Sequence, residues 1–238
     1  GIQSYPVWSP DGTQIVFASI GNGGLYRKPA GVSGQEAVLL GNGDRNLPLD
    51  WSRDGRYLLY DEGSTRIADW DLWVLPMEAN GKPRPYLATP FNEINAKFSP
   101  DGHWVAYQSN QSTRFEIYVS PFPDAAVAPA ALVSTAGGTY PRWSHDGRAL
   151  YYVSADDELM EVPVTPGATF KVGTPVPLFK LPPLQRALQR ANSTTAGVWT
   201  WDVTADGQRF LVNAAPSQEG AAPAPIIVDT DWRAKLPR

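Results

Sequence analysis

The stretch Val7-Trp8-Ser9-Pro10-Asp11-Gly12 decides the fold, because close copies of it recur along the chain. In each copy an apolar residue is followed by Ser or Thr, then by any residue, Asp and Gly. The other copies are Asp50–Gly55, Lys97–Gly102, Arg142–Gly147 and Asp202–Gly207. Their glycines lie 43, 47, 45 and 60 residues apart, and a period of about 40–50 residues indicates a repeat architecture.

Short apolar runs follow every copy at a fixed offset, as Ile15-Val16-Phe17 does after Gly12. Two further runs complete most units, such as Leu25-Tyr26 and Val38-Leu39-Leu40 in the first unit. Each unit is therefore predicted to hold four short strands, A to D, which make one propeller blade. We predict an all-β propeller of four-stranded blades, with five units at about 5–47, 48–94, 95–139, 140–199 and 200–238.

The Ser-x-Asp-Gly core of each copy lies between strands A and B and is predicted to form a tight hairpin. Pro10 and Pro100 suit the second turn position because their φ is already set, and Gly takes the positive φ that other residues resist. The large residue before Ser is predicted to pack between neighbouring blades, where an aromatic ring buries about 150–250 Å². This residue is Trp8, Trp51, Phe98 or Trp143 in the first four units and Val203 in the fifth.

Composition excludes several classes of protein. The chain has 238 residues, of which 44 are Pro or Gly, so many turns and few long helices are expected. The net charge of −4 and the absence of a basic run argue against a nucleic-acid binder. Cysteine is absent. His103 and His145 are predicted to be turn residues of the A-to-B hairpins, away from the mouth of the propeller channel. The sequence contains no Gly-x-Ser-x-Gly, His-Glu-x-x-His or phosphate-loop motif, and no apolar run long enough to span a membrane.

The repeated units resemble TolB-like β-propeller repeats. A closer resemblance is to the C-terminal propeller of bacterial membrane-anchored serine/threonine protein kinases, carried by segments such as Asp71–Pro76, Ile117–Pro123 and Asp206–Asn213. The resemblance implies a scaffold, a sensor, a binding module or the accessory domain of a hydrolase. In the resembling kinases the propeller lies on the periplasmic or extracellular face of the bacterial membrane, which is the location the resemblance implies.

The strand count does not close a ring. Four complete units and strands A to C of a fifth are predicted, with the last strand at Ile227-Val228. We expect the chain to be part of a larger propeller of six or more blades. The alternative is a five-bladed ring whose last blade has three strands or is completed by Ile2-Gln3-Ser4. An uncovered blade edge predicts self-association.

The D-to-A and B-to-C loops of a propeller share one face, called here the loop face, which is the usual binding face of the architecture. The loop at about 61–70 holds Asp61, Glu62, Arg66, Asp69 and Trp70, and predicts capture of a protein or small ligand, or of Ca²⁺. A solvated loop in which Asp71 caps strand C is the alternative, because Glu116 and Glu158 stand at the equivalent places. Further loop-face candidates are Asn92, Asn95 and Arg114.

A long segment at 162–201 holds no Asp or Glu and includes Arg186 and Arg190. Residues 181–191 of it are predicted to form a short helix after Pro182-Pro183, acting as a lid, docking an acidic partner or plugging the channel.

The residue before each strand A aromatic is predicted to face the axis. The belt of charges that results is Asp50, Lys97, Arg142 and Asp202, and we expect Asp50 to pair with Lys97 and Arg142 with Asp202 across adjacent blades. Charges near a buried axis need partners or water.

The sequence favours a non-catalytic binding, sensor or protein-interaction module without a cofactor. The alternatives are a propeller-type carbohydrate-active hydrolase or lyase, and the accessory propeller of an oligopeptidase-like hydrolase. An enzyme predicts several carboxylates of shifted pKa that converge in one deep pocket.

Overall fold

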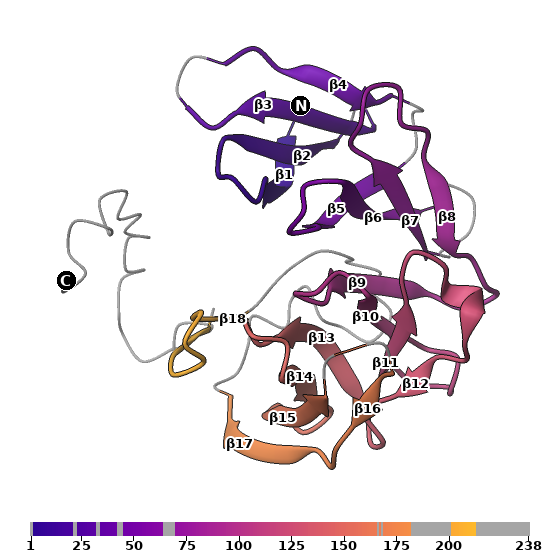
Figure 1. Ribbon diagram of the computed structural model, residues 1–238, viewed down its shortest axis with the longest axis vertical. Coiled ribbons are helices and arrows are strands. Elements are labelled where there is room, and N and C mark those ends of the chain that lie inside the picture. Colours follow the sequence, from indigo (N-terminus) through magenta and orange to yellow (C-terminus); the bar gives the residue numbers. More distant parts are fainter. Residues whose placement is uncertain are drawn as a thin grey trace, which may run out of the picture.

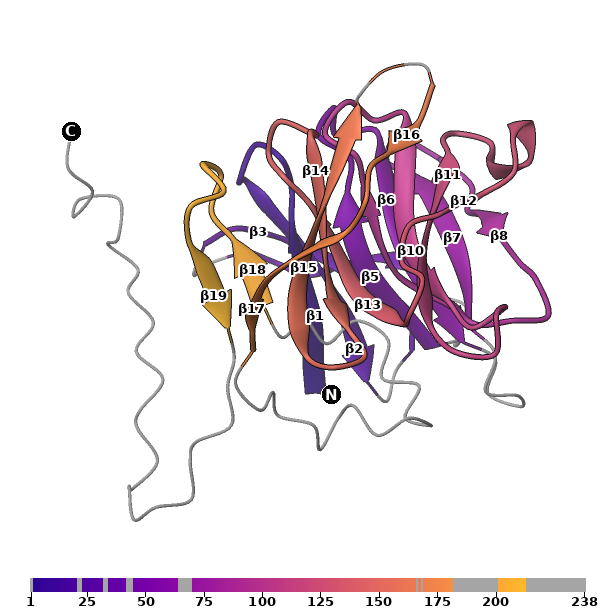
Figure 2. The same ribbon diagram turned by 90° about the horizontal axis from the view of Figure 1, so that it is seen from below.

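Four-stranded antiparallel sheets follow one another along the chain and stand around a common axis in the computed structural model (Figures 1 and 2). The structure describes residues 2–20, 23–31, 34–41, 45–63, 70–165, 167, 169–181 and 201–212. Blade 1 consists of β1 (Ile2–Trp8), β2 (Gln14–Ile20), β3 (Leu25–Pro29) and β4 (Ala37–Leu40). Blade 2 consists of β5 (Arg45–Trp51), β6 (Tyr57–Gly63), β7 (Trp70–Pro76) and β8 (Arg84–Leu87).

The later blades keep the same order, with the inner strand first. Blade 3 consists of β9 (Glu93–Phe98), β10 (Trp104–Ser109), β11 (Glu116–Pro121) and β12 (Ala131–Leu132), with the short helix η1 (Ala125–Val127) before β12. Blade 4 consists of β13 (Gly138–Trp143), β14 (Ala149–Ser154) and β15 (Glu158–Thr165), whose outer edge pairs with β16 (Lys171–Val172) and β17 (Val176–Lys180). Blade 5 contributes β18 (Trp201–Val203) and β19 (Phe210–Val212) to the described residues. The predicted all-β propeller of four-stranded blades is confirmed.

Strand β5 begins at Arg45, close to the expected start of the second unit at about 48. One alternative for the expected organisation is wrong. The segment Ile2–Ser4 does not complete the last blade, because it belongs to β1 and pairs with β2, Ile2 opposite Ile20. The predicted strand at Ile227-Val228 and most of the predicted helix at 181–191 lie outside the described residues.

The repeated hairpins have the geometry that the motif predicts. In the first four copies the Gly N–H donates to the Ser carbonyl at 2.8–3.0 Å, and the Ser hydroxyl donates to the Asp carboxylate at 2.5–2.7 Å. Each of these glycines has a φ of 70–74°. A type of turn that needs this φ favours Gly, which explains why Gly closes every copy.

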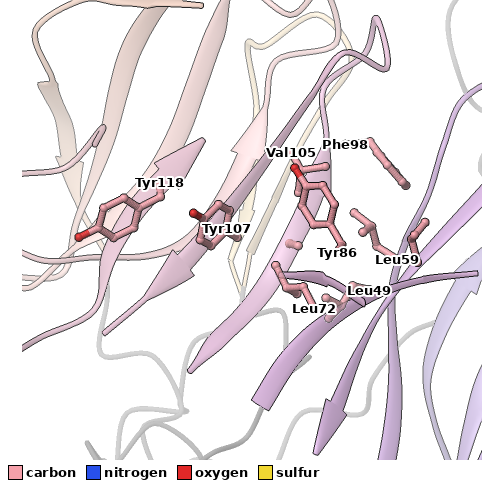
Figure 3. Close-up of a cluster of buried hydrophobic side chains, with 10 residues drawn as sticks. Leu49, Leu59, Leu72, Tyr86, Phe98, Val105, Tyr107 and Tyr118 are labelled. Atoms are coloured by element: carbon pink, nitrogen blue, oxygen red, sulfur yellow. The ribbon is translucent and has the colours of Figure 1, made fainter. Parts of the chain in front are cut away.

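The core lies mainly between neighbouring blades. Figure 3 shows one cluster, in which Phe98 of blade 3 and Leu59 of blade 2 belong to the same group of buried side chains. Trp143 also reaches the preceding blade, where its indole N–H donates to the Lys97 carbonyl at 3.1 Å. Trp8 occupies the same motif position in blade 1 and is 56% exposed. Inter-blade packing of the motif aromatic is thus confirmed for Phe98 and Trp143.

Within the described part of the chain, no helix combines the length and the apolar character that a membrane crossing requires.

Candidate functional site

The charged belt at the axis forms the first of its two predicted ion pairs. Lys97 Nζ lies 3.4 Å from Asp50 Oδ1 of the preceding blade and donates to the Leu49 carbonyl at 2.6 Å. The second Asp50 oxygen accepts the backbone N–H of Phe98 at 2.9 Å. Both side chains are largely buried, with 14% of Lys97 and 25% of Asp50 exposed. Asp50 therefore joins blade 2 to blade 3 through both a charge and a backbone bond.

The second predicted pair is also present. Arg142 Nη1 lies 3.3 Å from Asp202 Oδ1, and Arg142 Nε donates to the Trp201 carbonyl at 3.0 Å. The guanidinium carbon stands 5.8 Å from the centre of the Trp201 ring. Arg142 is 16% exposed, whereas Asp202 is 60% exposed. This pair therefore opens toward solvent on its acidic side.

The environment of the belt lowers the pKa of its cations. Burial lowers the pKa of Lys97, and the nearby charge of Arg142 acts in the same direction, while Asp50 opposes both effects. Burial likewise lowers the pKa of Arg142, and Asp202 and Asp50 oppose the shift. Taking a cation out of water disfavours its charged form, and carboxylates in reach restore it.

A pocket of about 310 Å³ opens at this belt, on the face of the A-to-B hairpins. Its wall combines the four belt residues with hairpin residues of blades 2 to 5, among them Arg53, His145 and Ala205. Arg53 Nη2 donates to the His145 carbonyl at 3.0 Å, so one side chain joins the hairpins of blades 2 and 4. We call this cavity the axial pocket. It lies on the face opposite to the loop face that the sequence favours.

The structure corrects the picture of the loop at 61–70. Asp61 lies within strand β6 and Trp70 begins strand β7, and both side chains are buried, as is that of Asn95 in strand β9. These three residues are therefore not presented on a solvated loop. Burial raises the pKa of Asp61 well above its usual range, and the backbone N–H of Asn95 opposes the shift. Arg45 covers Trp70, with its guanidinium carbon 4.8 Å from the ring centre.

Other loop-face candidates hold loops together. Asn92 accepts the Trp70 N–H at 3.1 Å through its side chain. Arg114 donates to Glu116 Oε1 at 2.7 Å, and Glu116 accepts the Gly137 N–H at 2.9 Å. The Glu116 carboxylate therefore holds neighbouring loop segments together. This agrees with the alternative that the acidic residue before strand C has a structural role in each blade.

The remaining loop-face candidates are only partly placed. Glu62 lies in strand β6, opposite Asp71 of β7, and is half-buried. Arg66, Asp69, Arg186 and Arg190 lie outside the described residues. The calcium expectation stays a prediction, although the described residues contain no group of three or more His, Cys, Asp or Glu able to hold a metal ion.

The sequence predicts only part of the wall of the axial pocket. It predicts the belt, from the position of these residues before the strand A aromatic. Arg53 and His145 stand where Pro10 and Pro100 stand in other copies, and this position by itself predicts only a turn. The signal that identifies them is this substitution itself, since a long or aromatic polar side chain at a turn corner reaches further than Pro.

A second pocket, of about 450 Å³, lies in blade 3, between Glu93 of β9, Tyr107 of β10 and the segment around η1, with Leu87 of blade 2 at its wall. Glu93 lines it, is buried, and has one carboxylate oxygen without a hydrogen-bond partner among the described residues. Burial raises the pKa of Glu93, with hydrogen bonds from Thr89 and Ser109 acting against the shift and Asp71 adding to it. The Tyr107 hydroxyl, whose pKa burial raises to about 12, lies on the same wall.

No model of a known protein family matches the sequence, and no curated protein matches it. Solved structures do match the fold. A putative TolB from Agrobacterium tumefaciens is 22% identical over 71% of this chain and 61% of its own, with a TM-score of 0.53. The periplasmic gluconolactonase of Pseudomonas aeruginosa is 18% identical over 87% of this chain and 63% of its own, with a TM-score of 0.54.

A puromycin-hydrolysing peptidase from Mycobacterium tuberculosis is 18% identical over 89% of this chain but 35% of its own, with a TM-score of 0.58. The chain spans between 45% and 63% of the first three solved structures that it matches. At these identities the likeness establishes a propeller fold of the kind seen in TolB. It does not distinguish a binding module from an enzyme.

Proposed function

We propose that the chain is a non-catalytic binding module, a sensor or interaction domain that receives a protein or small ligand at the axial pocket. One observation carries the proposal: the charged walls of the pocket are held in place by cross-blade contacts. Lys97 is fixed by Asp50 and a carbonyl, and Arg142 by Asp202 and a carbonyl. Recognition needs polar groups that are ordered before the ligand arrives, because ordering them on binding costs affinity.

The proposed setting is the periplasmic or extracellular face of a bacterial membrane. The resemblance of the repeats to the kinase-linked propeller supports this, and so does the shared fold with a periplasmic gluconolactonase. On this proposal the loop face is a second contact surface, to which Glu62 and the exposed part of Arg114 contribute.

Indole N–H signals in NMR spectra test the proposal, because Trp51 and Trp143 line the axial pocket. Small neutral, cationic and anionic probes are added separately to the protein. At least one class is expected to shift the Trp143 signal and to be recovered chemically unchanged. The Trp104 indole, which donates to the Gly167 carbonyl at 3.0 Å and lies outside the pocket wall, is the internal control. If no class moves the pocket signals, the proposed function is wrong.

An enzymatic propeller is the second candidate, and the pocket at Glu93 favours it. A buried carboxyl whose pKa is raised by burial holds its proton to a higher pH than a solvated one, which is the direction that a general acid requires. Hydrolysis of gluconolactone, followed by acid release, tests this candidate, because a gluconolactonase shares the fold. Turnover that disappears in Glu93→Gln supports an enzyme, and wild-type protein that leaves the lactone intact counts against this substrate class.

The accessory-propeller alternative remains a form of the binding proposal. The fold shared with 35% of a peptidase chain supports a propeller that accompanies a catalytic domain. Such a propeller would use the same axial pocket for contact.

A further inference from the structure

Two cations of neighbouring blades line the axial pocket. Lys97 of β9 and Arg142 of β13 occupy the same repeat position, and both are largely buried. The charge of Arg142 adds to the burial that lowers the pKa of Lys97. Like charges close together in a poorly solvated site cost free energy that an anion between them would recover.

The carboxylates of the belt offset only part of this charge. Asp50 shares its oxygens between Lys97 and the Phe98 N–H. Asp202 is 60% exposed, and the oxygen that faces Arg142 also accepts the Val203 N–H at 2.9 Å. Water competes strongly for a carboxylate this exposed, so its hold on the guanidinium is weak.

Arg53 adds a third positive charge to the wall. It is anchored on the His145 carbonyl, which keeps its guanidinium at the pocket. Three cations, Arg53, Lys97 and Arg142, therefore stand against the two carboxylates Asp50 and Asp202. The pocket carries a positive surplus on a chain whose net charge is −4.

We propose that the axial pocket binds the carboxylate group of an acidic ligand. This inference rests on the proposed binding function and names its ligand class. A guanidinium fork matches the planar carboxylate, and a surplus of one positive charge suits a monoanion better than a doubly charged phosphate. The carboxylate is supplied either by a free organic acid or by an acidic side chain of a partner protein.

Matched probes separate the charge from the shape of the ligand. N-acetyl-glutamate amide presents an acidic side chain, and N-acetyl-glutamine amide is its neutral counterpart. Glutarate is the free organic acid, and inorganic phosphate is the competing anion. The glutamate derivative is expected to shift the Trp143 indole signal and to bind more weakly as salt rises, because salt screens the charges. Preference for glutarate over the glutamate derivative indicates a free acid as the source, and the reverse indicates a side chain.

Variants at Ala205 test the site without touching the belt. Ala205 lines the pocket rim on an exposed hairpin, where other copies carry Pro, Arg or His. Ala205→Glu is expected to weaken binding of the carboxylate probe by about tenfold or more, because it adds a like charge to the rim. Ala205→Arg is the control of opposite charge and is expected to bind at least as tightly as wild type. Arg142→Gln, checked for an unchanged Tm, is expected to weaken binding as well.

The outcomes separate the inference from the proposed function. Binding of the acidic probe that fails in Ala205→Glu and persists in Ala205→Arg supports the inference. Equal binding of the neutral and acidic probes, or preference for a cationic probe, overturns it and leaves the binding function standing. Tighter binding of phosphate than of either carboxylate also overturns it. Silence of the Trp51 and Trp143 signals with every probe overturns both.

Discussion

The side-chain oxygen of Gln108 accepts the backbone N–H of Tyr140 at 2.9 Å and so joins blade 3 to blade 4. Tyr140 has a φ of +56°, at a point where the pairing of β13 with β14 shifts register. Few residues other than Gly adopt this conformation, and a bulge leaves a backbone group without its ladder partner. The same Gln108 oxygen also accepts from the Asn95 side chain at 3.0 Å.

Gln108→Met is expected to destabilise the protein by about 1–3 kcal/mol, because it leaves the buried Tyr140 N–H without an acceptor while keeping the length of the side chain. Urea denaturation followed by tryptophan fluorescence measures the loss. Gln108→Glu, measured at an acid pH where the carboxyl is protonated in both states, is the control, since it retains a neutral oxygen at the acceptor position. Equal stability of Gln108→Met and wild type would show that the bond contributes nothing.

Blade 2 has a related arrangement, in which the side chain is a carboxylate and both of its oxygens are buried without a hydrogen-bond partner among the described residues. Asp61 occupies in β6 the place that Gln108 has in β10, and the backbone N–H of Asn95, with a φ of +58°, acts on its carboxylate. One blade earlier, Ala18 offers no acceptor, and Pro48 of the next blade has no N–H to satisfy. Acceptor and donor are thus both present or both absent in these three blade pairs.

Asp61→Asn is expected to raise the Tm near pH 7 by about 2–4 °C or more, which corresponds to about 1 kcal/mol in a domain of this size. The folded protein holds the Asp61 proton to a higher pH than the unfolded chain does, because burial raises the pKa of Asp61. As the pH rises above the unfolded value, ionisation of the unfolded chain therefore opposes folding. Asparagine removes this cost and keeps an acceptor for the Asn95 N–H.

Thermal melts between about pH 4 and pH 8 measure the effect. The gain of Asp61→Asn over wild type should shrink toward zero as the pH falls, because Asp61 is then protonated in both states. Asp54→Asn is the comparison, since hydrogen bonds from Ser52 and the Arg56 N–H outweigh partial burial and lower the pKa of Asp54. A gain for Asp61→Asn that does not change with pH would show that ionisation of Asp61 is not its cause.

The hairpins and the belt could be predicted because they depend on local chemistry. A Ser-x-Asp-Gly turn satisfies itself within six residues, and a residue before the strand A aromatic faces the axis whatever the neighbours are. Asp50 and Lys97 carry opposite charges at the same position of adjacent blades, and this is enough to predict their ion pair.

The roles of Asp61 and Asn95 could not be predicted in the same way. Both look like loop residues because they are polar and stand near a strand end, yet each lies buried in a strand. Their partner belongs to the next blade, about one repeat away along the chain, and no local pattern reports it. Comparison of the repeated units does indicate this pairing, because the unit with Ala18 in place of an acceptor is followed by a unit with Pro48, which has no N–H to donate.

Phe98→Ala and Trp8→Ala are expected to differ sharply although they change the same motif position. Phe98 is 6% exposed and packs edge-on against Phe122 with ring centres 5.0 Å apart. Its removal is expected to cost about 3–5 kcal/mol, because it leaves a cavity between blades. Trp8 is 56% exposed, so its removal is expected to cost far less. Denaturant midpoints of the two variants provide the measurement.

Trp8 also allows a test of the expected self-association. The ring is 56% exposed, and an exposed apolar face beside a sheet edge is a site where a second copy can pack. If a second copy covers this face, Trp8→Gln should lower the sedimentation coefficient at high protein concentration. Identical sedimentation of Trp8→Gln and wild type would remove the support for association through this edge.

Asp50→Asn isolates the charge of the buried ion pair. Asparagine still has an oxygen to accept the Phe98 N–H, but it no longer neutralises Lys97. Burial lowers the pKa of Lys97, and without the Asp50 charge less opposes this effect. The folded variant therefore releases the Lys97 proton at a lower pH than the unfolded chain does. We expect a loss of about 1–3 kcal/mol near pH 7, the range for a hydrogen bond to a charged group.

This loss should become smaller as the pH rises above neutrality toward the ordinary pKa of lysine, about 10.4. In that range the unfolded chain keeps its proton on Lys97 while the folded variant gives it up, and stability rises with pH wherever the unfolded state binds more protons. Chemical denaturation of wild type and Asp50→Asn at several pH values measures the difference. Lys97→Met in the Asp50→Asn background should abolish the pH dependence, and a dependence that survives this second change would assign it to another group.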